Sequence, residues 1–239
     1  MLNVSRKEIK LSAKNDLSGR WGTAIGAMLL ATYIPSMVVS IPGSIFSFVY
    51  GMAMELGSYA MAGISYILMM VLMLVPTFLI VAPLLMGYIY FSLRIARHQD
   101  ANATMPYRAF TKGVYGRVTF GYFMMTLFIT LWSFLFIIPG IIKSFSYAMM
   151  PYIMMDNPNK TWKEALEESK QMMNGHKWDF FVLVMSFFGW LLLVGLTWGI
   201  LVVYVGPYMQ QAQANFYRAL KGEPLYAAQQ MNSYDRPQM

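Results

Sequence analysis

Very few side chains in this sequence have the type and spacing that acid–base or metal chemistry requires. The chain has two histidines, His98 and His176, which are far apart in the sequence, and it has no cysteine. A metal site needs a cluster of nitrogen, sulfur or oxygen ligands, and the lack of cysteine excludes thiolate metal sites, disulfides and a cysteine nucleophile. We therefore expect no metal and no other cofactor, and we interpret both histidines as isolated surface residues.

Two repeated patterns have both a chemical and a simpler structural interpretation. Thioether sulfurs favour Cu(I), but methionine also fills apolar space, which is the interpretation we favour for the pairs at 69–70, 124–125, 149–150, 154–155 and 172–173. Glu167-Glu168 resembles the paired glutamate of membrane proteases of the CAAX-processing type. The arginine expected after that pair is missing and no histidine follows His176, so a general base would have no partners. We expect a protein that is not an enzyme.

The residues that we select as candidates for a functional site are Lys143, Glu55, Tyr147 and Asp156, the last of which opens a polar segment. Lys143 is predicted to lie within a membrane span, where an ionisable residue is costly and is a reasonable candidate for a site. In one interpretation it faces inward, near Glu55 or Tyr147, and presents a cation to an anionic lipid head group or substrate at an external cavity. In the other, its long side chain carries the ammonium group to the outer interface.

The elements that must position these residues are long and apolar. The chain is 57% hydrophobic and 12% charged, with a mean hydropathy of +0.46, whereas soluble domains carry about 25% charged residues. Its apolar runs are long enough to cross a bilayer, which indicates a multi-pass membrane protein. The net charge of +7 then concerns orientation and anionic lipid at the cytoplasmic face. We expect no nucleic-acid partner, because the basic residues border the apolar runs.

Residues 1–20 are polar and basic and are predicted to form a short amphipathic helix on the membrane surface. Ser5-x-x-Glu8 has the form of a capping box, in which a hydroxyl and a carboxylate bind free amides of the first turn. An apolar residue recurs every four positions from Ile9 to Leu17, giving one apolar stripe, and Gly19 is predicted to end the helix. The alternative is a signal peptide, although no small-x-small cleavage site follows the apolar run.

The apolar runs of the first half predict two spans joined outside the membrane. Trp21 to Ile41 has about the 20 residues that a bilayer core needs, and Pro42-Gly43 is predicted to stop this span. Residues 44–59 contain no Lys or Arg, which predicts the external side. Ala60 to Leu93 then returns as one span that is kinked at its prolines.

The central stretch leaves two topologies open. Residues 94–117 are basic, which predicts a cytoplasmic loop, and Val118 to Ile138 leads outward. With a tight external turn at Pro139-Gly140 and a short return helix from Ile141 to Met155, the lysines of segment 157–177 lie inside and six spans result. With one span across residues 118–155, these lysines lie outside and the chain has four spans. We favour six spans, because the positive charge then stays on one side.

The last third of the chain repeats these signals. Thr161-x-x-Glu164 is a second capping box, which predicts an amphipathic cytoplasmic helix over 162–174 that ends at Gly175. Trp178 to Leu196 leads outward and Ile200 to Tyr217 returns. We thus predict an all-α bundle of about six spans over 21–221, built largely as hairpins, with both termini cytoplasmic and a flexible tail over 222–239. The similar hairpins are either an internal repeat or a consequence of membrane composition.

Short motifs spread along the chain resemble those of a known family. They are Lys10-Leu-Ser-Ala-Lys14-Asn-Asp-Leu17-Ser-Gly19-Arg-Trp21-Gly22, Ile137-Ile-Pro-Gly-Ile-Ile-Lys143, Ser146-Tyr147, Pro151-Tyr152, Asp156-Asn157-Pro158, Gly175-His176-Lys177-Trp178, Ser186-Phe-Phe-Gly189-Trp190 and Gly206-Pro207-Tyr208. In these motifs the chain is similar to the bacterial integral membrane family called domain of unknown function 975. The resemblance implies a multi-pass protein of the bacterial inner membrane, with no established activity or catalytic residues. A more distant similarity is to the membrane domain attached to some glycerophosphodiester phosphodiesterases, whose phosphodiesterase domain is absent here.

Two hypotheses about function follow from the sequence. The first is a non-enzymatic accessory or partner protein in a membrane assembly or in envelope homeostasis, which the lack of catalytic clusters and the helices at the inner face favour. Its expected partners are the bilayer, anionic lipid at the cytoplasmic face and another membrane protein. The second is a small transporter or exporter of a lipid, peptide or ion, which the broken helices and the polar side chains of Ser144, Ser146 and Tyr147 within a predicted span favour.

Overall fold

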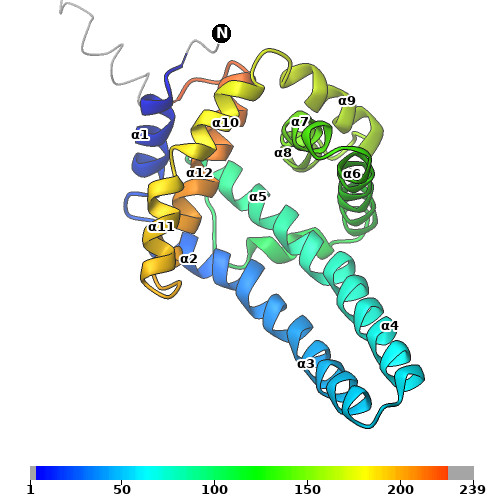
Figure 1. The fold of residues 1–239 in the computed structure, drawn as a ribbon. Coiled ribbons are helices and arrows are strands. Elements are labelled where there is room, and N and C mark those ends of the chain that lie inside the picture. Colours follow the sequence, from blue (N-terminus) through cyan, green and yellow to red (C-terminus); the bar gives the residue numbers. More distant parts are fainter. Residues whose placement is uncertain (1–3, 226–239) are drawn as a thin grey trace, which may run out of the picture.

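The protein folds into helices alone over residues 4–225, the part of the chain that the computed structural model describes. The outer parts of two long helical stretches form an arm that extends away from the other helices (Figure 1). The first stretch consists of α2 (Trp21–Met28), a π-helical turn (Leu29–Tyr33) and α3 (Ile34–Glu55), and the second of α4 (Tyr59–Pro76), a π-helical turn (Thr77–Val81) and α5 (Ala82–Ala96). At 1.5 Å per residue, each stretch is about 50 Å long or longer.

The remaining helices gather around α5 and the C-terminal helix α12 (Figure 1). A short 3₁₀ helix (Met105–Phe110) lies in the basic loop and packs on α5. The helices are α1 (Arg6–Leu17), α6 (Tyr115–Leu135), α7 (Ile137–Tyr147), α8 (Met150–Asp156), α9 (Trp162–Met172), α10 (Lys177–Met185), α11 (Phe188–Leu196) and α12 (Val202–Leu220).

The first helix begins and ends where its local signals predict. Ser5 caps α1 in a complete capping box with Glu8, and Gly19 follows the helix with a φ of +74°, a conformation that glycine adopts at little cost. The apolar stripe of α1, from Ile9 to Leu17, is buried against α12 and α5. The stripe therefore faces protein, and not the lipid surface that the sequence analysis assigned to it.

The predicted stop at Pro42-Gly43 is wrong, because α3 continues through both residues to Glu55. Gly43 allows α3 and α4 to pack closely, since a Cβ atom there would lie 1.8 Å from Cε of Met73. Residues 44–59 form the end of α3 and a turn at Gly57, whose φ is +68°, and their assignment to the external side stays a prediction. The second long stretch is one continuous helix from Tyr59 to Ala96, which agrees with the prediction of a single span over 60–93. Its π-helical turn lies just before Pro83.

The chain reverses at Phe136, and not at the predicted Pro139-Gly140 turn. Phe136 has extended backbone angles, φ −156° and ψ 137°, between α6 and α7. Pro139 lies in the first turn of α7, where a missing N–H costs no helical hydrogen bond. A Cβ atom at Gly140 would lie 2.3 Å from Oγ and 2.7 Å from Cα of Ser133, so this glycine permits α6 and α7 to pack closely. The predicted return helix 141–155 is divided into α7 and α8.

The capping box predicted at Thr161 and Glu164 is present, and α9 begins directly after it. Ser169 on α9 is fully buried, where its Oγ donates to the carbonyl of Ser146 and accepts from the backbone N–H of Met149. These two bonds satisfy backbone groups that the break between α7 and α8 leaves free. The predicted helix 162–174 thus also positions the end of α7.

A second break separates α10 from α11 at Ser186-Phe187. Lys10 of α1 lies over it: its Nζ donates to the carbonyl and to the hydroxyl of Ser186, both at 3.3 Å, and is 4.4 Å from the ring centre of Phe187. A cation at free carbonyls of a helix C-terminus is favourable. Burial lowers the pKa of Lys10, and the contact ties α1 to this break.

Within the described residues, three helical stretches are long and apolar enough to cross a membrane: Tyr59–Ala96, Tyr115–Leu135 and Lys177–Leu196. Large apolar side chains are exposed along the arm and at the α6–α7 reversal, where Ile137 is 75% exposed. The buried core instead lies where α1, α5, α8, α9 and α12 meet. The core therefore sits at one end of the helices, next to the charged residues.

Candidate functional site

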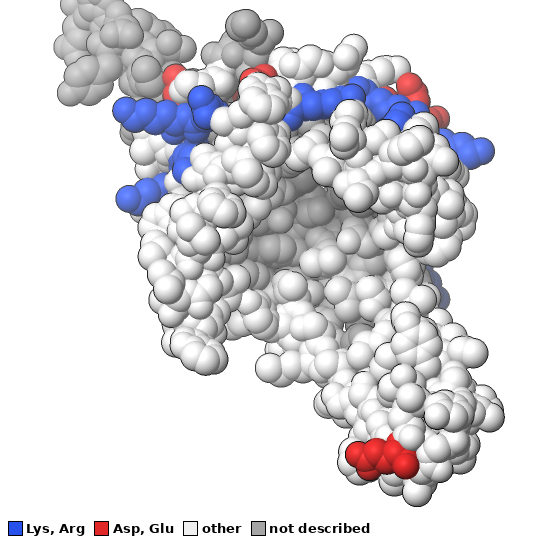
Figure 2. All heavy atoms as spheres, in the orientation of Figure 1, with Lys and Arg blue, Asp and Glu red and all other residues white. Residues whose placement is uncertain are grey.

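Most charged side chains of the protein lie near one end of its helices. Figure 2 shows the Lys and Arg residues of one face along a single edge, above a broad and partly hollowed surface that is almost free of charge. The sequence stretches between the charged segments hold almost no charge: Glu55 is the only charged residue in 21–93, Lys143 is the only one in 118–155, and 180–217 has none. The charged edge is therefore where the chain repeatedly returns.

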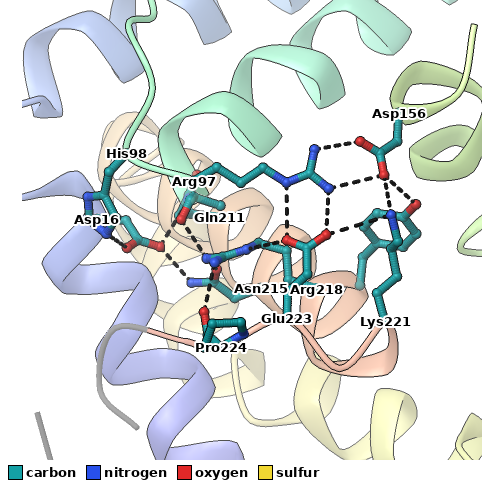
Figure 3. A network of polar contacts seen from close by, with 12 residues as sticks. Asp16, Arg97, His98, Asp156, Gln211, Asn215, Arg218, Lys221, Glu223 and Pro224 are labelled. Atoms are coloured by element: carbon teal, nitrogen blue, oxygen red, sulfur yellow. Dashed lines mark hydrogen bonds and ion pairs between the residues drawn. The ribbon is translucent and has the colours of Figure 1, made fainter. Parts of the chain in front are cut away.

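Polar and charged side chains from the ends of four helices join there in one network (Figure 3). Asp16 comes from α1, Arg97 and His98 follow α5, Asp156 ends α8, and the α12 end supplies Arg218 and Lys221. Glu223 belongs to the turn after α12. We call these seven residues the polar cluster. It holds chain segments together that are up to about 200 residues apart, as the bond between Asp16 and Asn215 illustrates.

Arg97 is the centre of the polar cluster. Its guanidinium group binds both oxygens of Asp156, at 2.5 and 3.0 Å, and both oxygens of Glu223, at 3.1 and 2.6 Å. Lys221 Nζ adds an ion pair to Asp156 at 2.7 Å, and the hydroxyl of Tyr217 donates to the same carboxylate at 3.1 Å. Paired geometry of this kind is the strong form of the arginine–carboxylate contact.

The pKa values in the cluster are set by burial and by these bonds. Hydrogen bonds to Asp156 and then to Glu223 raise the pKa of Arg97. Burial alone would raise the pKa of Asp156, but the bonds from Arg97 and Lys221 outweigh it and hold that pKa well below its usual range. The same competition, with Arg97 and Arg218 as donors, lowers the pKa of Glu223. Both carboxylates are therefore ionised at neutral pH.

Arg218 connects the end of α12 to the end of α5. It is 7% exposed; its Nε donates to Glu223 at 3.0 Å, and its two Nη atoms donate to the carbonyls of Ala96, at 2.5 Å, and Pro224, at 2.8 Å. The carbonyl of Ala96 is one of those that the end of α5 leaves without a helical partner. Arg218 thus closes this helix end and holds the turn after α12 in place.

Asp16 is the most deeply buried acid of the cluster, with a side chain that is 0% exposed. It accepts hydrogen bonds from Gln211 at 3.2 Å and Asn215 at 2.7 Å, and His98 Nε2 lies 3.3 Å from its second oxygen. Burial raises the pKa of Asp16 against these contacts. His98 has a φ of +53°, a left-handed conformation that is uncommon for residues other than glycine. His98 lies at the surface as predicted, with a side chain that is 48% exposed, but it is not isolated, because it pairs with Asp16. His176 is likewise not isolated, because it lies 3.2 Å from Asp179.

The four residues selected from the sequence do not form one site. Asp156 lies in the polar cluster, whereas Glu55 is exposed at the end of α3, at the tip of the arm (Figure 1). Tyr147 is buried at the end of α7, and the ammonium of Lys143 lies 4.8 Å from the ring centre of Trp132 on α6. Among residues 4–225 no ion pair joins Lys143 to a carboxylate. A role for Lys143 stays a prediction.

The sequence analysis missed most of the polar cluster. Its members are ordinary charged residues beside helix ends, and the only available signal was that Asp16, Arg97, Asp156 and Arg218 each occur near the end of a predicted helix. In residues 4–225 no group of three His, Cys, Asp or Glu side chains has the arrangement of a metal site. The cluster's chemistry is that of ion pairing and hydrogen bonding.

Comparison with known proteins gives one match. Neither the curated proteins nor the solved structures include a match to this chain. One family model matches residues 123–223, which contain α7 to α12 and most of α6. This range includes the Ile137–Lys143, Ser146-Tyr147, Pro151-Tyr152, Gly175–Trp178 and Gly206–Tyr208 motifs, so the resemblance seen in the sequence is confirmed. Over residues 123–223 the chain is similar to the family described as Protein of unknown function (DUF975).

Proposed function

We propose that this chain is a multi-pass protein of the bacterial inner membrane, with six crossings and with the polar cluster on the cytoplasmic side. We further propose that it acts as a non-enzymatic accessory or partner protein in a membrane assembly or in envelope homeostasis. The observation that carries the proposal is the polar cluster itself. Arg97 binds Asp156 directly, and Glu223 joins Arg97 to Arg218. Asn215 in turn joins Arg218 to Asp16, so residues 16, 97, 156 and 218 lie on the same side of any membrane.

An even number of crossings must then separate each of these residues from the next. Between Asp16 and Arg97 lie the two long stretches of the arm, between Asp156 and Arg97 lie α6 and the α7–α8 pair, and between Asp156 and Arg218 lie α10–α11 and α12. Each interval contains one of the three stretches that are long and apolar enough to cross. If a second crossing brings the chain back in each of the three intervals, six crossings result.

The distribution of charge supports the orientation. The basic loop 97–114, the segment 157–177 and the charged helix α1 all lie beside the polar cluster, and positive charge is retained on the cytoplasmic side of inner-membrane proteins. The turn between α11 and α12, where Trp198 is 97% exposed, would then be external. Because the chain has no cysteine, Trp198→Cys gives a single reactive thiol, which an impermeant maleimide should modify in intact cells. Absence of labelling there would contradict the orientation.

The arm supports the role of a partner protein. Its exposed part consists of α3 and α4, which carry large apolar side chains at the surface, such as Phe48 at 72%, Ile64 at 60% and Leu74 at 54%, whereas most of α5 is buried. In a membrane, the exposed surface of α3 and α4 faces lipid or is covered by another apolar partner.

A photo-reactive residue in place of Ile64 tests this role in cells. We expect a discrete adduct with a second membrane protein, and no adduct from the neighbouring Ser65, which is 6% exposed and serves as the matched control. Cells without the protein should also grow poorly under envelope stress. Adducts with lipid alone, together with unchanged growth, would contradict the accessory role.

The alternative function, a small transporter or exporter, is favoured by one structural feature. One helical stretch is broken at Ser186-Phe187, and two others contain π-helical turns, at Leu29–Tyr33 and Thr77–Val81. Broken helices line the substrate sites of many transporters. Flux of a lipid, peptide or ion through liposomes that contain the purified chain would favour this alternative. No flux across a broad panel would count against it.

A further inference from the structure

Two cavities adjoin each other between the end of α5 and the start of α6. One is polar, encloses about 500 Å³ and is lined in part by Arg94, Asn102, Thr104 and Arg108. The other is mostly apolar, encloses about 370 Å³ and has Tyr90, Val114 and Met155 in its wall. Arg108 lines both cavities, so together they form one cleft with a polar part and an apolar part. We call this the arginine cleft.

Three arginines supply the charge of the arginine cleft, and none of them uses all five of its guanidinium N–H donors within the described part of the chain. Arg108 is exposed, and among the described residues no hydrogen bond or ion pair engages its guanidinium group. Arg117 donates through Nη1 to the carbonyls of Asn157 and Lys160, but its Nε is buried and has no hydrogen-bond partner. Arg94 uses Nε on the carbonyl of Asp100 and Nη1 on the hydroxyl of Tyr90. The cleft therefore offers donors to an acceptor that the chain itself does not supply.

The nearby acids do not cancel this charge. Asp156 lines the apolar part, but Arg97 and Lys221 already bind its carboxylate. Asp100 is exposed at the edge of the polar part, which leaves three arginines against one available carboxylate. The forked guanidinium group suits phosphate oxygens better than it suits a simple halide, since it can donate two parallel hydrogen bonds.

The apolar part indicates what the phosphate is attached to. Tyr107 and Phe110, which lie on either side of Arg108 in the sequence, are 43% and 40% exposed. The apolar part is also lined by Val114 and Arg117, at the start of α6, one of the stretches able to cross a membrane. Basic pockets between helices at the cytoplasmic side favour anionic lipid head groups. We propose that the arginine cleft binds the phosphate of an anionic phospholipid between Arg108 and Arg117, with the glycerol and acyl region against Val114 and Met155. This rests on the membrane location proposed above.

Binding is measured on the full chain in nanodiscs or detergent, with phosphatidylglycerol as the probe and phosphatidylcholine as the neutral comparison. We expect preferential binding of phosphatidylglycerol, and a loss of about tenfold in its affinity in Arg108→Gln, since a charge-assisted hydrogen bond is removed. Arg6→Gln, an exposed arginine of α1 outside the cleft, is the matched control and should bind as the wild type does. Because Arg117 also holds backbone carbonyls, Arg117→Lys, which keeps the charge, is used there and should lose affinity less than Arg108→Gln does.

Three results would overturn the proposal. Unchanged binding in Arg108→Gln would exclude the cleft, and an equal loss in Arg6→Gln would show attraction by overall charge only. Saturable binding of inorganic phosphate that displaces the lipid and depends on Arg108 would assign the site to free phosphate and not to lipid. The side of the membrane is measured separately, by labelling a cysteine at residue 159, which is exposed and lies outside the cleft, so failure of lipid binding and failure of the topology are distinguishable.

Discussion

Replacing Arg97 by glutamine should destabilise the protein strongly, because Arg97 donates hydrogen bonds to both oxygens of Asp156 and to both oxygens of Glu223. The substitution leaves two half-buried carboxylates, 10% and 24% exposed, without their main partner. Removing one partner of a fully buried ion pair costs about 3–5 kcal/mol. Arg97 is 25% exposed, and Lys221 and Tyr217 still bind Asp156, so after allowance for screening by solvent we expect about 2 kcal/mol.

The assay is thermal unfolding of the purified protein in detergent, followed by the fluorescence of its six tryptophans. A change of 1 kcal/mol shifts the midpoint by about 2–4 °C for a chain of this size, so we expect Arg97→Gln to unfold roughly 4–8 °C below the wild type. Arg20→Gln is the control, since half-buried Arg20 makes one hydrogen bond, to the carbonyl of Gln99. The double variant Arg97→Gln/Asp156→Asn should recover part of the loss. A midpoint for Arg97→Gln equal to that of Arg20→Gln would refute the reasoning.

Three further predictions follow from the structure. The pKa values of Asp156 and Glu223 are lowered in the folded protein, so the stability that these carboxylates contribute is present above their unfolded pKa values of about 4 and is lost as the pH falls below them. The unfolding midpoint of the wild type should therefore exceed that of Arg97→Gln by less below about pH 4. A difference that grows there would contradict this prediction. Gly87→Ala should cost about 1–3 kcal/mol in the same assay, because the new Cβ atom would lie 2.0 Å from the carbonyl oxygen of Pro106. Gly63→Ala, whose Cβ atom would have nothing within 4 Å, should be neutral or stabilising. Equal unfolding midpoints for the two variants would contradict the close contact. Thr161→Ala removes the cap of α9 and should increase hydrogen exchange in its first turn at a cost of roughly 1 kcal/mol, and unchanged exchange would count against the capping box.

Local signals in the sequence were reliable where the structure depends on neighbouring residues alone. Both capping boxes, at Ser5 and at Thr161, are present, because each needs only a hydroxyl and a carboxylate three residues apart. Gly175 has the positive φ expected just beyond a helix. These features require no knowledge of the tertiary structure.

Proline and glycine were misread where helix packing decides the outcome. Pro42-Gly43 and Pro139-Gly140 have the composition of turns, yet both lie within helices. Each glycine permits a close approach of a second helix, at Met73 and at Ser133 respectively, and this requirement is invisible without the partner helix. Composition alone therefore could not distinguish a turn from a packing position.

The candidate site depends on contacts between distant parts of the chain, which one sequence cannot reveal. Arg97 binds Glu223, 126 residues later, and Gln211 binds Asp16, 195 residues earlier. Asp156 was selected because it opens a polar segment, but nothing in the sequence paired it with Arg97. The requirement for an even number of crossings between these residues follows only from their contacts in the folded protein.

The most direct test of the account is the side of the membrane on which residue 159 lies. Asn159 is exposed and three residues from Asp156, which binds Arg97. Asn159→Cys and Asn102→Cys should both remain unmodified by an impermeant maleimide in intact cells and should both react with a permeant one, as the shared polar cluster requires. Modification at residue 159 from outside, with residue 102 protected, would restore the four-span topology and contradict the account.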